Sequence, residues 1–317
     1  MLLKYKKFSR PISICIAFAM FALVIAELIF VASPVQNSLY MYGLLITELM
    51  LFVTAVAGCF ITRQDPREMF PVKKPLVRQI FGVLVFWIGC YMLIITLTIA
   101  VSSLAPQALM ERSADISSFL TTVNPFVSFL IVAVSPAICE EAVHRGFILH
   151  FLRPIENKWL IIVIMGVLFG VFHLDPIRFV PTALLGGAIT YIALETDNLL
   201  LGALLHFINN ALPAAISFVS YDSDALSNAL TEEAMAEASK LIYGPLGIGS
   251  TMIFAFSAPW IVLAGSVLIH GKGYKCPHLT AKIIICALSS AVLLIGGILL
   301  TALGIWQSFG SFLAIPG

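Results

Sequence analysis

The side chains that could do chemistry are few, and most of them follow one apolar stretch. After FVSFLIVAVSPAIC the chain places Glu140, Glu141, His144 and Arg145 within six residues. On a helix, Glu140 and His144 share one stripe, while Glu141 and Arg145 share another. Two adjacent carboxylates cannot both ionise cheaply in a low dielectric, so we expect a Glu141–Arg145 ion pair and a separately tuned Glu140. Pro136 removes a backbone hydrogen bond just before this cluster and can kink the helix there.

Two later apolar segments supply matching polar groups. His173 ends the run MGVLFGVF, four residues after Phe169, and His206 and Asn210 lie one helical turn apart. A lone histidine in an apolar helix is more often a core residue than a catalyst. Two histidines, an amide and an acidic cluster on three segments favour a polar site inside a membrane. The alternative is a helix end whose charges reach the aqueous phase.

The composition places these segments in a membrane. Hydrophobic residues make up 60% of the 317-residue chain, charged residues only 11%, and the mean hydropathy is +1.02. A soluble domain carries roughly 25% charged residues, so a soluble globular enzyme, a disordered tail and a nucleic-acid binder are excluded. We therefore predict an all-α, polytopic helical membrane protein with about eight to nine transmembrane helices and its active site within the helix bundle.

The apolar runs define candidate spans, since a spanning helix needs about 20 apolar residues. The fifth and sixth runs are the shortest, and Pro176 and Pro181 flank them. The first run is too long for the apolar part of a signal peptide. The nine runs are 11–33, 39–62, 79–104, 125–150, 159–175, 179–194, 199–219, 246–270 and 283–303.

The distribution of charge predicts the orientation. With a cytoplasmic N-terminus, alternation of the spans leaves only Arg112, Arg178 and Lys240 of the 18 basic residues outside. This bias follows the positive-inside rule. It predicts a multi-pass integral membrane protein whose N-terminus is cytoplasmic. The acidic segment 220–240 then lies outside, as a solvated connection or as a lid over a substrate entrance. Its sequence Thr231-Glu232-Glu233 predicts the start of a short helix.

The remaining intramembrane polar groups receive structural interpretations. Glu27 and Glu48 are isolated carboxylates on the first two spans, and each can be protonated or paired with a neighbouring helix. The six cysteines fall mostly inside apolar runs and include no CxxC pair. They are typical of buried small hydrophobic residues rather than of a disulfide framework or a metal cluster.

The three motifs together resemble the CPBP family of intramembrane proteases, which includes the type II CAAX prenyl endopeptidases and the bacteriocin-processing, or Abi, proteins. The family pattern is EExxxR, FxxxH and HxxxN on three spans. The sequence has Glu140-Glu141-Ala-Val-His-Arg145, Phe169 to His173 and His206 to Asn210 in that order. The resemblance implies a catalytic core at 125–219, between N-terminal helices at 1–124 and an acidic loop with C-terminal helices at 220–317.

The resemblance also implies a reaction and roles for these residues. Glu140, with His173, would activate a water for peptide hydrolysis, and His206 and Asn210 would stabilise the tetrahedral intermediate. Glu141, Arg145, His144 and Phe169 would support the site. The residue at His144 is commonly Phe in this family, and a protonated His144 would favour an ionised Glu140. The substrate would be a membrane-associated peptide or protein, such as a prenylated CAAX protein or a precursor peptide.

Several alternatives stay open. Glu140, His173 and His206 could form a two-histidine, one-carboxylate zinc set, but no HExxH is present and we favour the cofactor-free glutamate mechanism. A proton-coupled transporter would use the same residues as a relay, and a non-catalytic immunity or scaffold protein would keep them unused. His173 lies about six residues past the midpoint of its run, so we expect that helix to continue past His173 toward Asp175.

Overall fold

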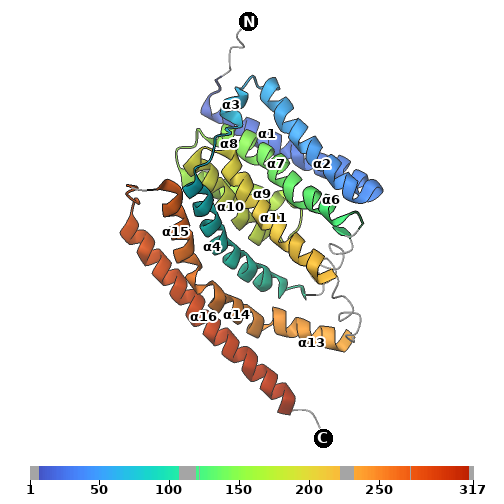
Figure 1. The fold of residues 1–317 in the computed structure, drawn as a ribbon, viewed down its shortest axis with the longest axis vertical. Helices are drawn as coiled ribbons and strands as arrows, with labels where there is room; N and C mark the ends of the chain where they lie inside the picture. Colours follow the sequence, from blue (N-terminus) through green and yellow to red (C-terminus); the bar gives the residue numbers. More distant parts are fainter. Residues whose placement is uncertain (1–6, 107–118, 121, 222–231, 272, 314–317) are drawn as a thin grey trace. The chain divides into compact units, whose positions relative to one another are not determined.

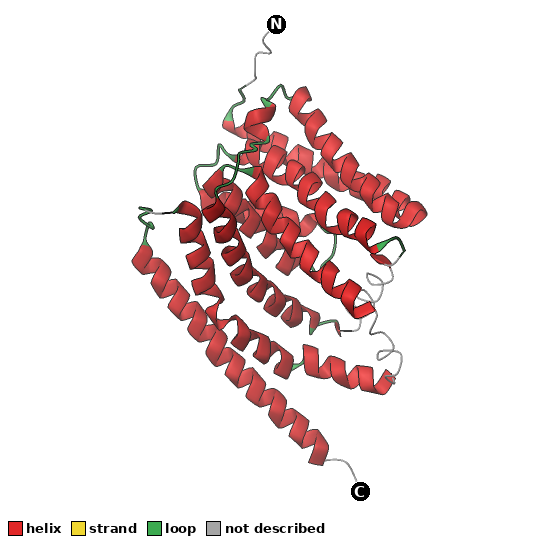
Figure 2. Cartoon of the chain, viewed as in Figure 1, coloured by secondary structure: helices red, strands yellow, loops and turns green. Residues whose placement is uncertain are grey.

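The structure is a computed structural model that describes residues 7–106, 119–120, 122–221, 232–271 and 273–313. Every regular element in these residues is a helix, and none of them forms a strand (Figure 2). The all-α class is therefore confirmed. By its internal contacts the chain divides into two units. Unit 1 comprises Met1–Val77, Ala114–Asp175 and Thr182–Tyr221, and unit 2 comprises Arg78–Ser113, Pro176–Pro181 and Asp222–Gly317.

Seven helices of the described residues are long and apolar enough to cross a membrane, so the chain is a multi-pass membrane protein. Two of the nine expected runs are not separate spans among the seven. The first two runs lie in one helical segment, and the fifth forms a helix of only 15 residues. The seven segments are Arg10–Ile61, Val77–Ser102, Pro125–Leu152, Phe179–Thr196, Leu199–Phe218, Pro245–His270 and Leu279–Phe309.

Unit 1 contains the helices of the expected catalytic core together with the first two runs (Figure 1). Its elements, with most of α10 in this unit, are α1 (Arg10–Glu27), η1 (Leu28–Ala32), α2 (Ser33–Ile61), α3 (Pro66–Met69), α6 (Pro125–Phe129), η2 (Leu130–Val134), α7 (Ser135–Glu141), η3 (Ala142–Ile148), α8 (Leu149–Leu152), α9 (Lys158–Phe172), α10 (Phe179–Thr196) and α11 (Leu199–Tyr221).

The segment Arg10–Ile61 folds back on itself. Its break lies at Tyr40, whose φ of 49° and ψ of −125° are not helical. On either side of the break, residues early in the segment meet late ones: Thr54 donates to the Glu27 carboxylate over 2.7 Å, and Gly58 lies against Met20. The expected runs 11–33 and 39–62 therefore form two antiparallel arms, as two successive runs predict, although they belong to one continuous helical segment.

A continuous helix from α6 to α8 carries the acidic cluster, and Pro136 alters it as expected. Proline has no N–H, so the carbonyl of Val132, four residues earlier, loses its helical donor. The backbone widens into the π-helical turn η2 directly before α7, and a second π-helical stretch, η3, follows Glu141. Ser135 Oγ donates to the Ile131 carbonyl over 2.6 Å, which satisfies one acceptor of the widened turn.

Glycines allow α9 and α10 to approach closely. A Cβ atom on Gly166 would lie 2.7 Å from the carbonyl oxygen of Ala183, and one on Gly186 would lie 2.5 Å from the Cβ of Phe169. The helix α9 ends at Phe172, so the expected continuation past His173 toward Asp175 is wrong. Pro176 disfavours a helical conformation for the residue before it, and Leu174 already has a φ of 50°.

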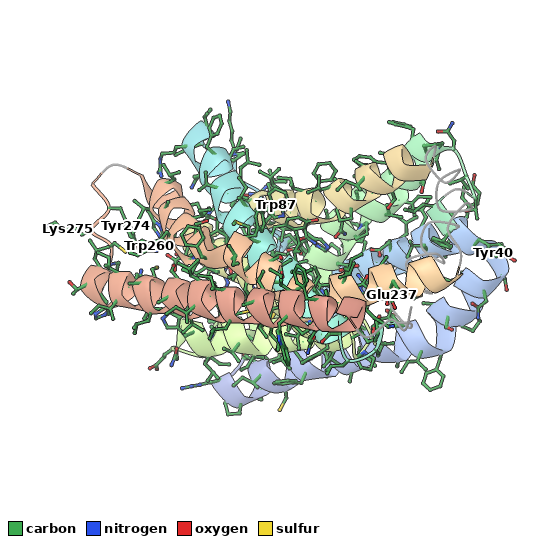
Figure 3. The ribbon with its side chains drawn as sticks, turned by 90° about the horizontal axis from the view of Figure 1, so that it is seen from below. Tyr40, Trp87, Glu237, Trp260, Tyr274 and Lys275 are labelled. Carbon is green, nitrogen blue, oxygen red and sulfur yellow. The ribbon has the colours of Figure 1, made fainter. Side chains whose placement is uncertain are left out.

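Unit 2 is built on the same close packing of small residues. A Cβ atom on Gly89 would lie 2.8 Å from the Ala258 carbonyl oxygen, and one on Gly249 would lie 2.5 Å from the Thr301 nitrogen. Tyr274 follows α15 in a loop (Figure 3). Its ring stacks on that of His270. The elements are α4 (Val77–Ser102), α13 (Glu232–Tyr243), α14 (Pro245–Phe254), η4 (Ala255–Ser257), α15 (Ala258–His270) and α16 (Leu279–Leu313).

The expectations for the acidic segment and the cysteines are met in part. The helix α13 begins at Glu232, as the sequence predicts. Residues 222–231 lie outside the described residues, so the choice between a connection and a lid stays a prediction. All six cysteines are free. Cys15 is exposed and Cys276 is half-buried, while Cys59, Cys90, Cys139 and Cys286 are buried.

Candidate active site

The acidic cluster lies in the interior of unit 1. Glu140 is 7% exposed, and Glu141, His144 and Arg145 are at most 2% exposed. A helix end with charges that reach water would expose these side chains, so that alternative is wrong for all four residues. Buried charges need partners, and the following contacts show which atoms of the four residues have one.

Glu141 and Arg145 form the expected ion pair. Arg145 Nη1 donates to Glu141 Oε1 over 2.8 Å, and both side chains are fully buried. Arg145 Nη2 donates to the carbonyl oxygen of Gly186 on α10, also over 2.8 Å. The ion pair therefore fixes the acidic helix against α10, and Glu141 is committed to a structural role.

His206 joins the two carboxylates from α11. Its Nδ1 lies 2.9 Å from Glu141 Oε1, and its Nε2 lies 3.9 Å from Glu140 Oε2. A carboxylate accepts, so Nδ1–H donates to Glu141, and this bond orients Nε2 toward Glu140. The longer separation exceeds a hydrogen bond, and Glu140 Oε2 has no hydrogen-bond partner among the described residues. Glu141 Oε2 also lacks a partner, but Glu141 Oε1 accepts two hydrogen bonds, whereas no hydrogen bond reaches either Glu140 oxygen among the described residues.

Phe169 is the centre around which the site residues pack. Its ring centroid lies 5.1 Å from the ring of His144, 4.9 Å from that of His173 and 5.6 Å from that of His206. The guanidinium carbon of Arg145 lies 4.7 Å from the same centroid, in a cation–π contact. One buried aromatic ring on α9 therefore positions a residue from each of the three motifs.

His173 and His144 are both oriented by a carbonyl one turn earlier. His173 Nδ1 lies 2.8 Å from the Phe169 carbonyl oxygen, and His144 Nδ1 lies 2.9 Å from that of Glu140. Carbonyl oxygens accept, so both Nδ1 atoms donate and a neutral ring keeps Nε2 as its acceptor. The His144 ring also packs edge to face on Phe172, with centroids 4.8 Å apart. His144 therefore packs as an aromatic residue would.

Asn210 meets the helix that Pro136 distorts. Its Nδ2 lies 3.4 Å from the Val132 carbonyl oxygen, the acceptor that loses its helical donor to the proline. This separation is long for a hydrogen bond, so Asn210 is only weakly held on the side of η2. The structure thus places Asn210 beside the acidic helix but not within hydrogen-bond distance of Glu140.

The zinc set that the sequence allows is not assembled as a metal-holding group. Among the described residues, no group of three or more His, Cys, Asp or Glu side chains is arranged to hold a metal ion. His173 and His206 lie against Phe169, and His206 Nδ1 is occupied by Glu141. The cofactor-free mechanism stays a prediction, and no step below is assigned to zinc.

Glu48 is the site neighbour that the sequence analysis interpreted as structural. It lies on α2, is 3% exposed, and its Oε2 has no hydrogen-bond partner among the described residues. It interacts electrostatically with both Glu140 and Cys139. Glu27, the other isolated carboxylate, instead accepts a hydrogen bond from Thr54. An unpartnered intramembrane carboxyl group was the available signal, but only the fold shows its neighbour.

Fold and site together define a polytopic helical membrane protein with a buried cluster of Glu, His and Arg side chains. Residues 122–212 match the family model described as "Type II CAAX prenyl endopeptidase Rce1-like". This match agrees with the resemblance of the three motifs to the CPBP family. The matched segment includes Glu140, His173, His206 and Asn210. The search of curated proteins and the search of solved structures found no match.

Proposed function

We propose that this protein is an intramembrane endopeptidase that hydrolyses a peptide bond of a membrane-associated substrate by means of an activated water. The observation that carries the proposal is the difference between the two adjacent carboxylates. Glu141 Oε1 accepts hydrogen bonds from Arg145 and His206, whereas no hydrogen bond reaches the Glu140 carboxylate among the described residues, and its Oε2 lies 3.9 Å from His206 Nε2. The Glu141 carboxylate is engaged by two cationic or polar partners, and the Glu140 carboxylate is available to a water.

Glu140 acts as the general base in this proposal. The carboxylate accepts a proton from water, and the resulting hydroxide attacks the carbonyl carbon of the scissile peptide bond. The tetrahedral intermediate collapses as the C–N bond breaks, and the protonated Glu140 returns the proton to the leaving amine. His173 assists from the end of α9, where its Nδ1–H bond to the Phe169 carbonyl holds the imidazole ring in position.

His206 and Asn210 stabilise the oxyanion of the intermediate. His206 donates from Nε2 when its ring is protonated, with Glu141 as the counter-charge at Nδ1. Asn210 donates from Nδ2, which only a long contact of 3.4 Å ties to the Val132 carbonyl oxygen. A weakly held donor can turn toward a developing charge at little cost. Glu141, Arg145, Phe169 and His144 keep these groups in position.

The test is cleavage by the purified full chain reconstituted in liposomes. The substrates are a farnesylated CAAX peptide and the same peptide without its prenyl group. We expect cleavage by the wild type and a loss of about 10²–10⁴-fold in Glu140→Gln, the range typical for removal of a general base. Glu27→Gln is the matched control, because Glu27 is also an intramembrane carboxylate but bonds to Thr54. It should retain activity.

Three outcomes would contradict the mechanism. Unchanged cleavage by Glu140→Gln would remove the proposed base. Loss of activity with a chelator, restored by zinc, would show that the enzyme is a metalloprotease instead. Proton-coupled uptake by the same liposomes, without cleavage, would show a transporter. Preference for the prenylated peptide assigns a CAAX-type substrate, and equal cleavage of both peptides assigns a broader peptide specificity.

A further inference from the structure

A cationic cavity lies in unit 1 where several of its helices end, away from the acidic cluster. Its volume is about 300 Å³, and its charged lining residues are Arg67, Glu68, Lys73, Arg153 and Asp197; Pro71 and His150 complete the lining. The cavity lies among α3, the segment that follows α3, the end of α8 and the turn between α10 and α11. The label positions of α3 and α8 in Figure 1 mark this end of unit 1.

Backbone contacts fix the walls of the cavity. Asn198, in the turn before α11, accepts from the Lys73 N–H over 3.2 Å and donates to the Lys73 carbonyl over 2.8 Å. The Leu199 N–H donates to the Pro71 carbonyl, also over 2.8 Å. The side chain of Asp65 caps α3 by accepting from the Arg67 N–H. The cavity is therefore built by segments more than 120 residues apart in the chain.

The charges of the cavity are arranged around one carboxylate. Asp197 accepts from Lys73 and from Arg153, each over 2.6 Å. Partial burial opposes ionisation of this carboxyl group, but its hydrogen bonds from Lys73 and Arg153 outweigh burial and lower the pKa of Asp197. Two cations thus share one permanent counter-charge. Arg67 forms no ion pair within the described part of the chain. With Glu68 as the second carboxylate, the lining has three cations and two anions, so it carries an excess of one positive charge.

The neighbouring surface combines these cations with exposed apolar side chains. Val72 and Leu76 flank Lys73 in sequence and are exposed, and Trp159 is exposed at the start of α9. Lys158, next to Trp159, pairs with Glu195 at the end of α10. Apolar helices therefore end here beside one exposed tryptophan and several basic residues, a combination that is typical of a membrane–water interface.

We propose that this cavity binds the phosphate headgroup of an anionic membrane lipid. Arg67 has donors available for the phosphate, and Lys73 and Arg153 retain donors beyond those that Asp197 occupies. Basic pockets between helix ends are suited to such headgroups. The exposed Val72 and Leu76 provide apolar contact for the acyl region, which a free phosphate would not use. The proposal does not depend on the protease function.

The test is the thermal stability of the detergent-purified full chain during titration with lipid. The probes are short-chain phosphatidylglycerol, short-chain phosphatidylcholine and inorganic phosphate. We expect saturable stabilisation by phosphatidylglycerol only. Arg67→Gln should weaken the apparent affinity about fivefold, a change typical of one basic side chain at an anionic surface, and Arg67→Lys should retain most of it. Arg67 is exposed and unpaired, so its loss should not unfold the chain.

A charge-matched control separates a site from a general surface effect. Lys158→Gln removes one positive charge at the same end of unit 1, but Lys158 pairs with Glu195 and does not line the cavity. It should keep the wild-type affinity. Three results would overturn the proposal: equal stabilisation by phosphatidylcholine, equal stabilisation by inorganic phosphate, or the same loss of affinity in Lys158→Gln as in Arg67→Gln.

Discussion

At the scale of single residues, the two buried carboxylates of the site differ because their partners differ. Glu141 Oε1 accepts from Arg145 and His206, while no hydrogen bond reaches the Glu140 carboxylate among the described residues. The chemistry of the pair therefore depends on Arg145, which neutralises one carboxylate without occupying the other. Arg145 also reaches the Gly186 carbonyl and lies over Phe169. No smaller cation could make the same three contacts.

The first prediction concerns this arginine. Arg145→Ala leaves Glu141 as an uncompensated buried charge, so we expect the free energy of unfolding to fall by about 3–5 kcal/mol. Arg145→Lys keeps the charge but loses the planar guanidinium fork. Its free energy of unfolding should lie between those of the wild type and Arg145→Ala. Thermal and denaturant unfolding in detergent measure the change.

Arg153→Ala is the control for that prediction. It also breaks an ion pair, with Asp197, but that pair is exposed. Because exposed ion pairs contribute at most about 1 kcal/mol, this variant should lose no more than that. Equal losses in Arg145→Ala and Arg153→Ala would show that burial does not set the importance of the Glu141–Arg145 pair.

Much of the site could be predicted at the residue scale. Helical spacing alone predicts the Glu141–Arg145 pair and separates Glu140 from it. Phe169 could be placed only as part of a motif, because its packing on four site residues comes from three helices that meet in space. Glu48 lies about 90 residues from Glu140 in the chain. Nothing in its local sequence reveals that neighbour.

At the scale of helices, the close approach of α9 and α10 positions Phe169. A Cβ atom on Gly186 would lie 2.5 Å from the Cβ of Phe169, whereas one on Gly187 would lie 3.5 Å from the Ile162 side chain. The first distance forces a shift, and the second is an ordinary contact. Of these two adjacent glycines of α10, only Gly187 therefore has room for an added Cβ atom.

The second prediction follows from this difference. Gly186→Ala should destabilise the protein by about 1–3 kcal/mol, the range for overpacking, and should lower cleavage because Phe169 must move. Gly187→Ala should be neutral or stabilising by up to about 1 kcal/mol, since alanine favours helix. Unfolding and cleavage are measured on both variants. Full activity in Gly186→Ala would disprove the role given to Phe169.

Helix ends were harder to predict than helix existence. The run 159–175 did predict a helix, but α9 ends at Phe172 and leaves His173 as its cap. Pro176 was a usable signal for that end. A common depth for His173 and Glu140 in the membrane would instead have required the helix to continue past His173. The reversal at Tyr40 did have a signal, because the expected runs 11–33 and 39–62 are separated by a short stretch that contains Pro34, Gln36 and Asn37.

At the scale of the whole molecule, the site residues all belong to unit 1. The motif residues and Glu48 lie in Met1–Val77, Ala114–Asp175 and Thr182–Tyr221, and the match to the Rce1-like family covers only 122–212. Composition alone predicts the membrane class of the entire chain, but no motif falls in unit 2. The contribution of unit 2 to stability can therefore be tested separately from the catalytic activity proposed for unit 1.

The third prediction is that damage to unit 2 lowers stability without altering catalysis. A Cβ atom on Gly249 would meet backbone atoms of α16, 2.5 Å from the Thr301 nitrogen, whereas one on Gly296 would meet only the flexible end of Met252. Gly249→Ala should therefore destabilise the protein by about 1–3 kcal/mol, and Gly296→Ala should be tolerated. Both should keep the wild-type cleavage rate per folded molecule at temperatures below unfolding.

The comparison with Gly186→Ala makes this prediction decisive. Gly249→Ala and Gly186→Ala introduce the same methyl group at the same calculated separation of 2.5 Å from a neighbouring helix, one in each unit. If catalysis depends on unit 1 alone, cleavage per folded molecule falls only in Gly186→Ala. An equal fall in Gly249→Ala, measured on fully folded protein, would mean that unit 2 holds or closes the site, and the site would then need residues beyond the three motifs.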